Sequence, residues 1–203
     1  MMDISRHVQA AYDQIVLAYA DRNHGTMADN LIALAERLVR HTSRSAHIID
    51  VGCGTGRDMA WFESQGLTVT GIDLSAGMLA YARGQVRGDL LAMNMSHLGF
   101  RKAHFDGAWC CASLLHVPKR AAPQALGEIH RVLKAGSMLI VSLQEGTGEG
   151  WEEGYVAGIR RFFARYQADE MRWMLCSTGF AVRDIGSSHG HNRDWLSFVC
   201  LAE

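Results

Sequence analysis

Apolar residues recur along the chain in two patterns, short β-branched runs and longer runs with helical spacing. The runs at 48–51 and 69–73 are rich in isoleucine and valine, as buried parallel strands are. After the first of them, Met59 and Phe62 begin an apolar face with the three-to-four-residue spacing of a helix. Strands that alternate with helices in this way indicate an α/β domain built on a parallel sheet.

The same patterns define the remaining expected elements. Strands are expected at 48–51, 69–73, 86–90, 105–113, 138–143, 181–186 and 195–201, the last two as an antiparallel pair. Helices are expected at 3–20, 26–41, 76–82, 124–134 and 168–177, in addition to the one that begins near residue 58. The chain is therefore expected to form a single domain over residues 1–203.

A glycine-rich turn follows the first strand, where residues 50–56 read D-V-G-C-G-T-G. Glycine is needed where the backbone bends with positive φ or lets a ligand come close. A dinucleotide fingerprint has glycines at its first, third and sixth positions, but here the sixth position is Arg57. The spacing favours a nucleoside-like ligand over a pyrophosphate and disfavours a nicotinamide dehydrogenase. A plain strand-to-helix turn remains the alternative.

The run at 50–56 resembles the first motif of the class I S-adenosylmethionine-dependent methyltransferases, and the resemblance continues along most of the chain. It implies a three-layer, Rossmann-like, doubly wound sheet of seven strands, mostly parallel with an antiparallel C-terminal strand. It also implies S-adenosyl-L-methionine as cofactor and methyl transfer to oxygen, nitrogen or sulfur of a small molecule, mainly by positioning. The alternatives are methylation of RNA or protein, and a cofactor-binding partner protein without catalysis.

Asp73 is the clearest candidate for binding the cofactor's ribose. It lies at the carboxyl end of the second predicted strand, and open parallel sheets bind ligands outside those ends. A carboxylate there accepts hydrogen bonds from both ribose hydroxyls. The alternative role, capping the helix at 76–82, is better filled by Ser75.

The resemblance implies further cofactor contacts. Asp89 and Leu90, at the exit of the third predicted strand, are expected against the adenine, with an ordinary turn as the alternative. Tyr19 is expected to reach the methionine end of the cofactor. The complete expected set is Tyr19, Asp50, Gly52, Cys53, Gly54, Gly56, Asp73, Leu74, Met78, Asp89, Leu90 and Cys111.

His116 is the only candidate for a catalytic residue. It follows the fourth predicted strand, and imidazole titrates near neutral pH, as a general base must. A structural role in closing the loop before Pro118 is equally consistent with this position. Methyl transfer often needs no strong base, so the chemistry does not require His116.

Two segments are expected to cover the site. Residues 1–41 form a helical lid or cap, with simple packing on the edge of the domain as the alternative. Residues 144–166 are rich in glycine, aromatic and basic residues, and are expected to form a long mobile excursion on the acceptor side. Packing over the edge of the sheet is the alternative reading of this second segment.

Composition and charge limit the kinds of partner that are expected. A formal net charge of −1 argues against a nucleic-acid partner, and no apolar run reaches the roughly 20 residues of a membrane helix. Without a hydrophobic signal core near the N-terminus, the protein is expected in the cytoplasm, as a monomer or homodimer. The five cysteines lack C-x-x-C spacing and are expected to be reduced. No metal site is expected, because His189 and His191 fit a polar loop better.

Overall fold

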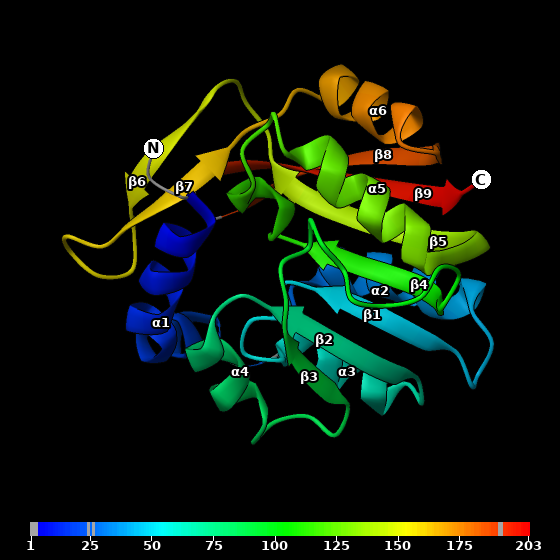
Figure 1. Cartoon of the computed structure of the whole chain (residues 1–203), viewed down its shortest axis with the longest axis horizontal. Coiled ribbons are helices and arrows are strands. Elements are labelled where there is room, and N and C mark those ends of the chain that lie inside the picture. The colour runs from blue at the N-terminus through cyan, green and yellow to red at the C-terminus, as the bar shows by residue number, and fades with distance from the viewer. Residues whose placement is uncertain (1–3, 24, 26, 191–192) are drawn as a thin grey trace.

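The central feature of the fold is a seven-stranded sheet with strand order β3-β2-β1-β4-β5-β9-β8 (Figure 1). The structure is a computed structural model that describes residues 4–23, 25, 27–190 and 193–203. The strands are β1 (His47–Val51), β2 (Thr68–Asp73), β3 (Asp89–Ala92), β4 (Phe105–Cys111), β5 (Leu133–Gln144), β8 (Phe180–Gly190) and β9 (Arg193–Ala202). Strand β9 runs antiparallel to both of its neighbours, whereas the pairs formed by β1 to β5 are all parallel. The predicted fold class is confirmed.

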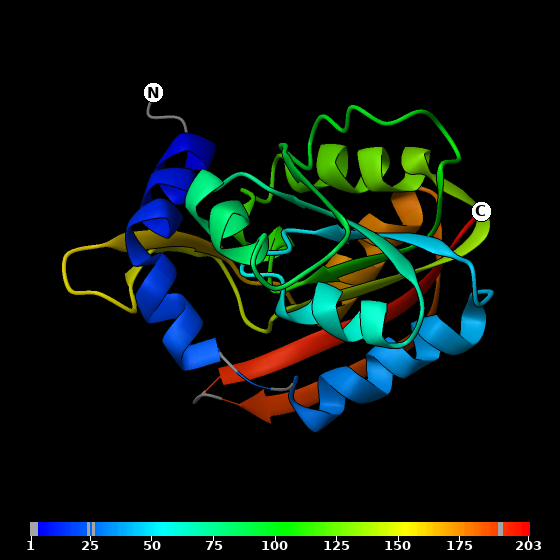
Figure 2. The same ribbon diagram turned by 90° about the horizontal axis from the view of Figure 1, so that it is seen from below.

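Helices cover both faces of this sheet and make it a three-layer structure (Figure 2). The helices are α1 (Ile4–Asn23), α2 (Asp29–His41), α3 (Arg57–Ser64), α4 (Ala76–Ala82), α5 (Ala122–Val132) and α6 (Ala168–Ser177), with a 3-10 turn η1 (Leu114–His116). Buried side chains of α5 and α6 pack with Ile49 and Leu139 in one core. Those of α2 and α3 pack with Ile48 and Ile140 in the other. Successive strand residues thus fill opposite layers.

The glycine-rich segment at 144–166 differs from the expected mobile excursion. It contains a two-stranded antiparallel hairpin, β6 (Glu149–Glu153) and β7 (Arg160–Ala164), which forms a sheet of its own. Trp151 and Phe162 lie opposite each other across the hairpin. Cross-strand aromatic pairs of this kind stabilise a hairpin, and the glycine content of the segment concealed the pairing.

Several predicted element boundaries are wrong, those of the third strand and of the helix expected at 124–134 among them. The third strand is Asp89–Ala92 and not 86–90, because its register with β2 sets Ala92 level with Asp73. The helix expected at 124–134 is Ala122–Val132, and β5 begins at once with Leu133. Gly136, which follows the expected helix, lies within β5, with φ of +77°.

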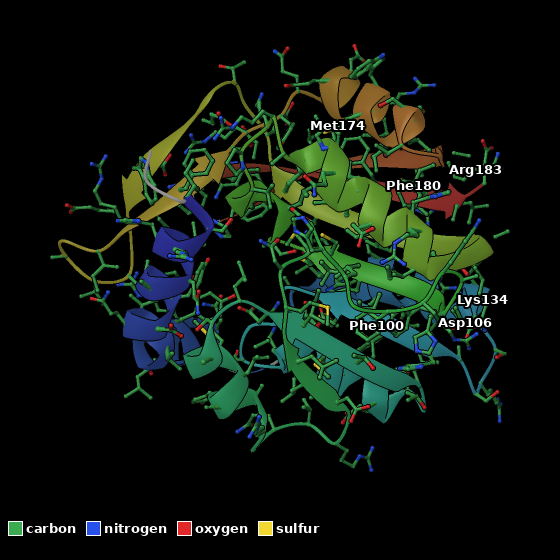
Figure 3. All side chains as sticks on the ribbon, in the orientation of Figure 1. Phe100, Asp106, Lys134, Met174, Phe180 and Arg183 are labelled. Carbon is green, nitrogen blue, oxygen red and sulfur yellow. The ribbon has the colours of Figure 1, made fainter. Side chains whose placement is uncertain are left out.

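The two ends of the sheet differ in how they are closed. At the amino end of β4, Asp106 accepts hydrogen bonds from the Lys134 ammonium and from the His47 amide (Figure 3). These contacts engage both oxygens of the Asp106 carboxylate. The carboxyl ends of β1, β2 and β4 instead surround open space. The order of strands reverses between β1 and β4, and this is where ligands bind in open α/β sheets.

Candidate active site

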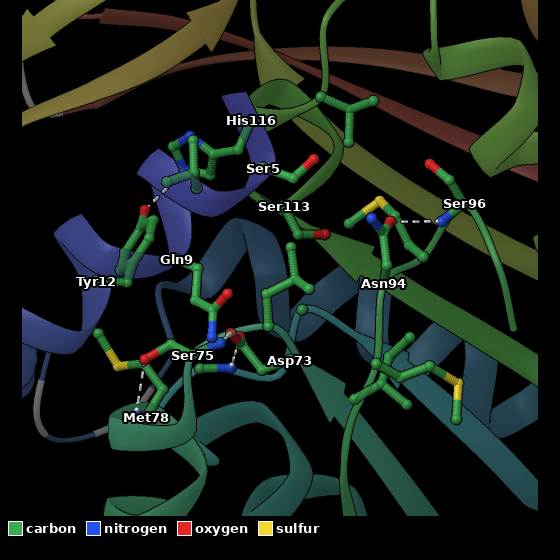
Figure 4. Close-up of a pocket in the computed structure, with 18 of the residues that line it drawn as sticks. Ser5, Gln9, Tyr12, Asp73, Ser75, Met78, Asn94, Ser96, Ser113 and His116 are labelled. Atoms are coloured by element: carbon green, nitrogen blue, oxygen red, sulfur yellow. Dashed lines mark hydrogen bonds between the residues drawn. The ribbon is translucent and has the colours of Figure 1, made fainter. Parts of the chain in front are cut away.

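Two neighbouring cavities lie at the carboxyl ends of the strands. The larger, about 360 Å³, is walled by α1 on one side and by the ends of β2, β3 and β4 on the other (Figure 4). The second, about 290 Å³, extends toward α3 and the β8–β9 pair. Tyr19, Gly52 and Cys111 line both cavities, so the glycine turn separates one from the other.

Seven further predicted residues line these cavities. The larger one is lined by Gly54, Asp73, Leu74, Met78 and His116. The second is lined by Asp50 and Cys53. Gly56 lines neither. It begins α3 with φ of +83° and packs against Ala82 and Val86, so its place is structural.

Gly52 and Gly54 serve different purposes in the turn. Gly52 has φ of +81°, and a Cβ there would lie 2.3 Å from the Cβ of Ser113. Its absent side chain therefore lets the turn pack on the end of β4. Gly54 has φ of +53°, and a Cβ there would meet only the ring of Tyr19, at 3.9 Å. Gly54 is thus the position at which the backbone is open to a ligand.

Asp73 is held in place by main-chain amides. Its Oδ2 accepts a 2.9 Å hydrogen bond from the Gly54 amide, and its Oδ1 a 2.8 Å bond from the Ser75 amide. Each oxygen keeps a further acceptor position, so the carboxylate remains able to bind a diol. Burial raises the pKa of Asp73, although the bonds from these amides oppose that rise.

Asp50 is a buried carboxyl group with an unsatisfied oxygen. Its side chain is 3% exposed, and Oδ2 has no hydrogen-bond partner among the described residues. Burial, together with the nearby carboxylates of Asp58 and Asp73, raises the pKa of Asp50 well above its usual value. A buried acceptor without a partner costs stability, and a cationic donor placed in the second cavity would remove that cost.

The surroundings of Asp50 carry more negative than positive charge. Asp58 accepts hydrogen bonds from Nε1 of Trp109 at 2.9 Å and from Nε of Arg57 at 2.7 Å. Three carboxyl groups (Asp50, Asp58 and Asp73) therefore face one guanidinium around the glycine turn. Such a site suits a ligand that carries positive charge.

His116 is fixed in one tautomer by two hydrogen bonds. Its Nδ1 lies 2.6 Å from the carbonyl oxygen of Phe162, which only accepts, so Nδ1 carries the proton. Its Nε2 lies 2.7 Å from the hydroxyl of Tyr12, so Nε2 accepts that O–H. Burial lowers the pKa of His116 to about 3, which keeps the ring neutral. The expected base lies in the cavity, but its lone pair is already engaged.

Asp89 and Leu90 line neither cavity, and this corrects their expected place against the adenine. They begin β3, and Asp89 is level with Thr70, three residues before the end of β2. The residues that follow β3 and line the larger cavity are instead Met93, Asn94, Met95 and Ser96. Setting the third strand level with the end of β2 would have identified them from the sequence.

Helix α1 supplies much of the cavity wall that sequence reasoning missed. Its inward face carries Ile4, Ser5, Val8, Gln9 and Tyr12, of which the helical spacing indicated only the apolar members. Asp13 ties the helix down, because its Oδ1 accepts a 2.6 Å bond from the Ser75 hydroxyl and a 2.9 Å bond from the Gly77 amide. Helix α1 is therefore attached directly to the start of α4.

Within the described ranges, no three histidine, cysteine or acidic side chains come together as metal ligands, and His191 lies outside those ranges. In the same part of the chain, no helix has the length and apolar character needed to cross a bilayer.

The sheet order, the glycine turn and the acid at the end of β2 define a Rossmann-like protein with a cavity at its switch point. The family described as "Methyltransferase domain" matches residues 49–141. An O-methyltransferase of Aspergillus nomiae, rstn1, is 33% identical over 174 residues, which cover 76% of this chain and 75% of that protein. The chain belongs to this family, the class I S-adenosylmethionine-dependent methyltransferases.

Similarity in structure is broader than similarity in sequence. Magnesium protoporphyrin IX methyltransferase from Synechocystis, solved with bound SAM, superimposes with a TM-score of 0.81 at 14% identity, over 100% of this chain and 99% of that one. The methyltransferase GfsG of Streptomyces halstedii is 35% identical over 117 residues, covering 54% of this chain. The chain spans only 41% of GfsG, and 60% of two further relatives.

Proposed function

We propose that the protein transfers a methyl group from S-adenosyl-L-methionine to a small-molecule acceptor. The observation that carries this proposal is the pair of acids on the two sides of the glycine turn. Asp73, fixed by amides, lines the larger cavity, and Asp50, with its unsatisfied oxygen, lines the second. Asp73 suits a ribose diol and Asp50 suits an ammonium. S-adenosyl-L-methionine carries both of these groups.

The residues around the cavities divide the cofactor between them. Asp73 would hold the ribose, with Leu74 and Met78 beside it, and Asn94 and Met95 would lie along the adenine. Asp50, Cys53 and the open backbone at Gly54 would hold the methionine portion. Tyr19 and Cys111 line both cavities and would meet the junction between the two portions.

Bound S-adenosylmethionine would supply a methyl group on a positively charged sulfur. Loss of the methyl group leaves that sulfur as a neutral thioether. The protein therefore mainly has to hold an acceptor in line with that methyl group. Positioning of this kind is worth roughly 7–11 kcal/mol in favourable cases. We assign α1 and the β6–β7 hairpin to the cover of the site, since both contact His116 at the wall of the cavity. Such a cover would keep water from the reacting groups.

The acceptor is proposed to be a small molecule. Among the relatives, the Aspergillus nomiae protein is named an O-methyltransferase, which favours oxygen as the accepting atom. A formal net charge of −1 gives no electrostatic attraction to RNA, so that alternative has less support. A cofactor-binding protein without turnover is the remaining alternative.

Calorimetry with S-adenosylhomocysteine and, separately, with NAD tests the cofactor. We expect binding of the adenosyl compound and none of NAD, and the reverse would overturn the proposal. A methyl-transfer screen over small-molecule pools, with radiolabelled S-adenosylmethionine, then tests turnover. Binding without transfer to any hydroxyl, amine, thiol or carboxylate acceptor would favour the alternative without catalysis.

A further inference from the structure

A chain of hydrogen bonds joins three elements above the larger cavity. The guanidinium of Arg161, on β7, donates from Nη1 to the Tyr12 oxygen at 3.1 Å. The hydroxyl of Tyr12, on α1, donates to Nε2 of His116 at 2.7 Å, as the dashed line in Figure 4 shows. His116 donates from Nδ1 to the carbonyl of Phe162. Tyr12 and His116 both line the cavity, whereas Arg161 does not.

Arg161 is a buried cation without a carboxylate partner in the described ranges. Its side chain is 9% exposed, and its Nε has no hydrogen-bond partner there. Its charge instead faces the rings of Tyr12, Tyr155 and Phe163, at 4.6 to 5.5 Å from their centroids. Burying a charge without a carboxylate partner is costly. Its closest polar contact is the Tyr12 oxygen.

The Tyr12 oxygen has one lone pair that its hydrogen bonds leave unused. The phenol has one O–H, which is given to His116, and two lone pairs, one of which accepts from Arg161. The remaining lone pair is on the oxygen of a side chain that lines the cavity. It is therefore able to accept a hydrogen bond from an acceptor hydroxyl, which His116 in this arrangement is not.

We propose that Tyr12 is a catalytic residue that takes the proton of an acceptor hydroxyl and passes its own proton to Nε2 of His116. The inference rests on the proposed function and names the acceptor class, a neutral alcohol or phenol. The acceptor oxygen forms its bond to the methyl carbon, and the electron pair of the broken carbon–sulfur bond stays on sulfur. The proton moves to the Tyr12 oxygen while the Tyr12 proton moves to His116, which later releases it to water.

A weak base is enough for this transfer. Positive charge develops on the acceptor oxygen as the new bond forms, so its proton becomes strongly acidic. The groups that face the pair are Arg161 and Tyr155 from the hairpin segment, Tyr19 from α1, and Asp73 from β2. Burial raises the pKa of Tyr12 to about 12, and Arg161 opposes that rise. The positive charge of Arg161 disfavours a Tyr12 oxygen that carries two protons. When Tyr12 takes the acceptor's proton, its own proton therefore moves on to His116.

The first test does not need turnover. Nitrogen NMR of the full-length protein with S-adenosylhomocysteine bound reports the tautomer of His116. We expect Nδ1 protonated and Nε2 accepting a hydrogen bond from pH 5 to 9, and a shift of the Nε2 signal in Tyr12→Phe. An Nε2 that carries a proton, or that does not respond to Tyr12→Phe, would overturn the relay even if methyl transfer is confirmed.

The second test compares acceptor classes found in the pool screen. For alcohols and phenols, Tyr12→Phe should lower kcat by about 10²- to 10⁴-fold, the range of general acid–base catalysis, with little change in affinity for S-adenosylhomocysteine. Carboxylates carry no proton to lose and should be unaffected. Tyr81→Phe, an exposed tyrosine on α4, is the matched control. Equal kcat for Tyr12→Phe and the parent on a hydroxyl acceptor would overturn the proposal.

A second variant covers the case in which Tyr12→Phe does not fold. His116→Gln removes the final proton acceptor but keeps Tyr12, and should cause a comparable loss with hydroxyl acceptors. Where both single variants fold, the double variant should lose no more than either, because the two residues act as a unit. Full additivity of the two losses would contradict a relay. A parent protein that methylates nothing would count against the proposed function, while the NMR result still decides the relay.

Discussion

The Gly54 amide donates a 2.9 Å hydrogen bond to Oδ2 of Asp73, and this bond joins the turn after β1 to the end of β2. The same carboxylate holds the Ser75 amide at the start of α4. Asp73 therefore orients the backbone around the site as well as offering its own oxygens. Substitutions at either end of this bond separate the two roles.

Asp73→Asn should weaken binding of S-adenosylhomocysteine by about 10- to 100-fold. Hydrogen bonds to a charged group are worth about 1.5–3 kcal/mol, and each 1.4 kcal/mol is a factor of ten. The amide keeps the shape of the side chain but loses the charge and one acceptor. Calorimetry measures the affinity, and Asp184→Asn, an exposed carboxylate paired with Arg37, is the control. Unchanged affinity would remove Asp73 from the ribose site.

Gly52→Ala and Gly54→Ala should fail in different ways. The first places a methyl group 2.3 Å from Ser113 in a left-handed backbone, and we expect a loss of about 2–5 kcal/mol of unfolding free energy. The second meets only Tyr19, and should cost about 1–2 kcal/mol while lowering ligand affinity at least tenfold. Denaturant unfolding and calorimetry measure the two effects. Similar losses of stability in both variants would contradict this assignment.

Binding of S-adenosylhomocysteine should release a proton from Asp50. Burial and the neighbouring carboxylates raise its pKa, so between the usual value of 3.8 and that raised value the carboxyl is neutral. The ligand's ammonium favours the charged form, so affinity should rise with pH through this range and level off above it. Calorimetry in buffers of different ionisation enthalpy measures the protons released. Asp50→Asn should abolish the release, and its persistence in that variant would assign it to another group.

Arg161→Met should raise the pKa values of both Tyr12 and His116. The guanidinium lowers the pKa of Tyr12 by its charge and its hydrogen bond, and lowers that of His116 by its charge. Burial remains in the variant, so the pKa of His116 should rise from about 3 but stay below its usual value of 6.5. Histidine NMR titration measures this change. Arg160→Met, on the exposed neighbouring residue, should leave the titration unaltered.

The parts of the fold that depend on local pattern were predictable from the sequence. The helix Ala168–Ser177 and the Ser75 cap were placed correctly, because each has a local signal in spacing or capping chemistry. The start of β3 was not placed correctly. The strand itself contains few buried residues, and pairing with β2 sets its position. That error placed the expected adenine contacts at Asp89 and Leu90, whereas the residues after β3 that line the larger cavity include Asn94 and Met95.

The relation of Tyr12 to His116 had no signal in the sequence. The two residues are 104 positions apart and meet because α1 crosses the open end of the sheet. Phe162 and Arg161 come from a hairpin whose strands were not expected at all. Contacts between distant segments depend on tertiary packing, and a single sequence does not encode them in any local pattern.

Phe162 directs His116 through its peptide carbonyl and not through its ring. Any amino acid at that position would present the same oxygen while the hairpin stays paired, so a substitution that keeps the packing against Trp151 leaves the protonation pattern of the imidazole unaltered. What the arrangement does not tolerate is a change in spacing. An insertion or deletion of one residue in β7 before Phe162 would turn its carbonyl away from His116 and release the imidazole from its fixed tautomer. The length of β7 therefore matters more to this contact than the identity of its residues.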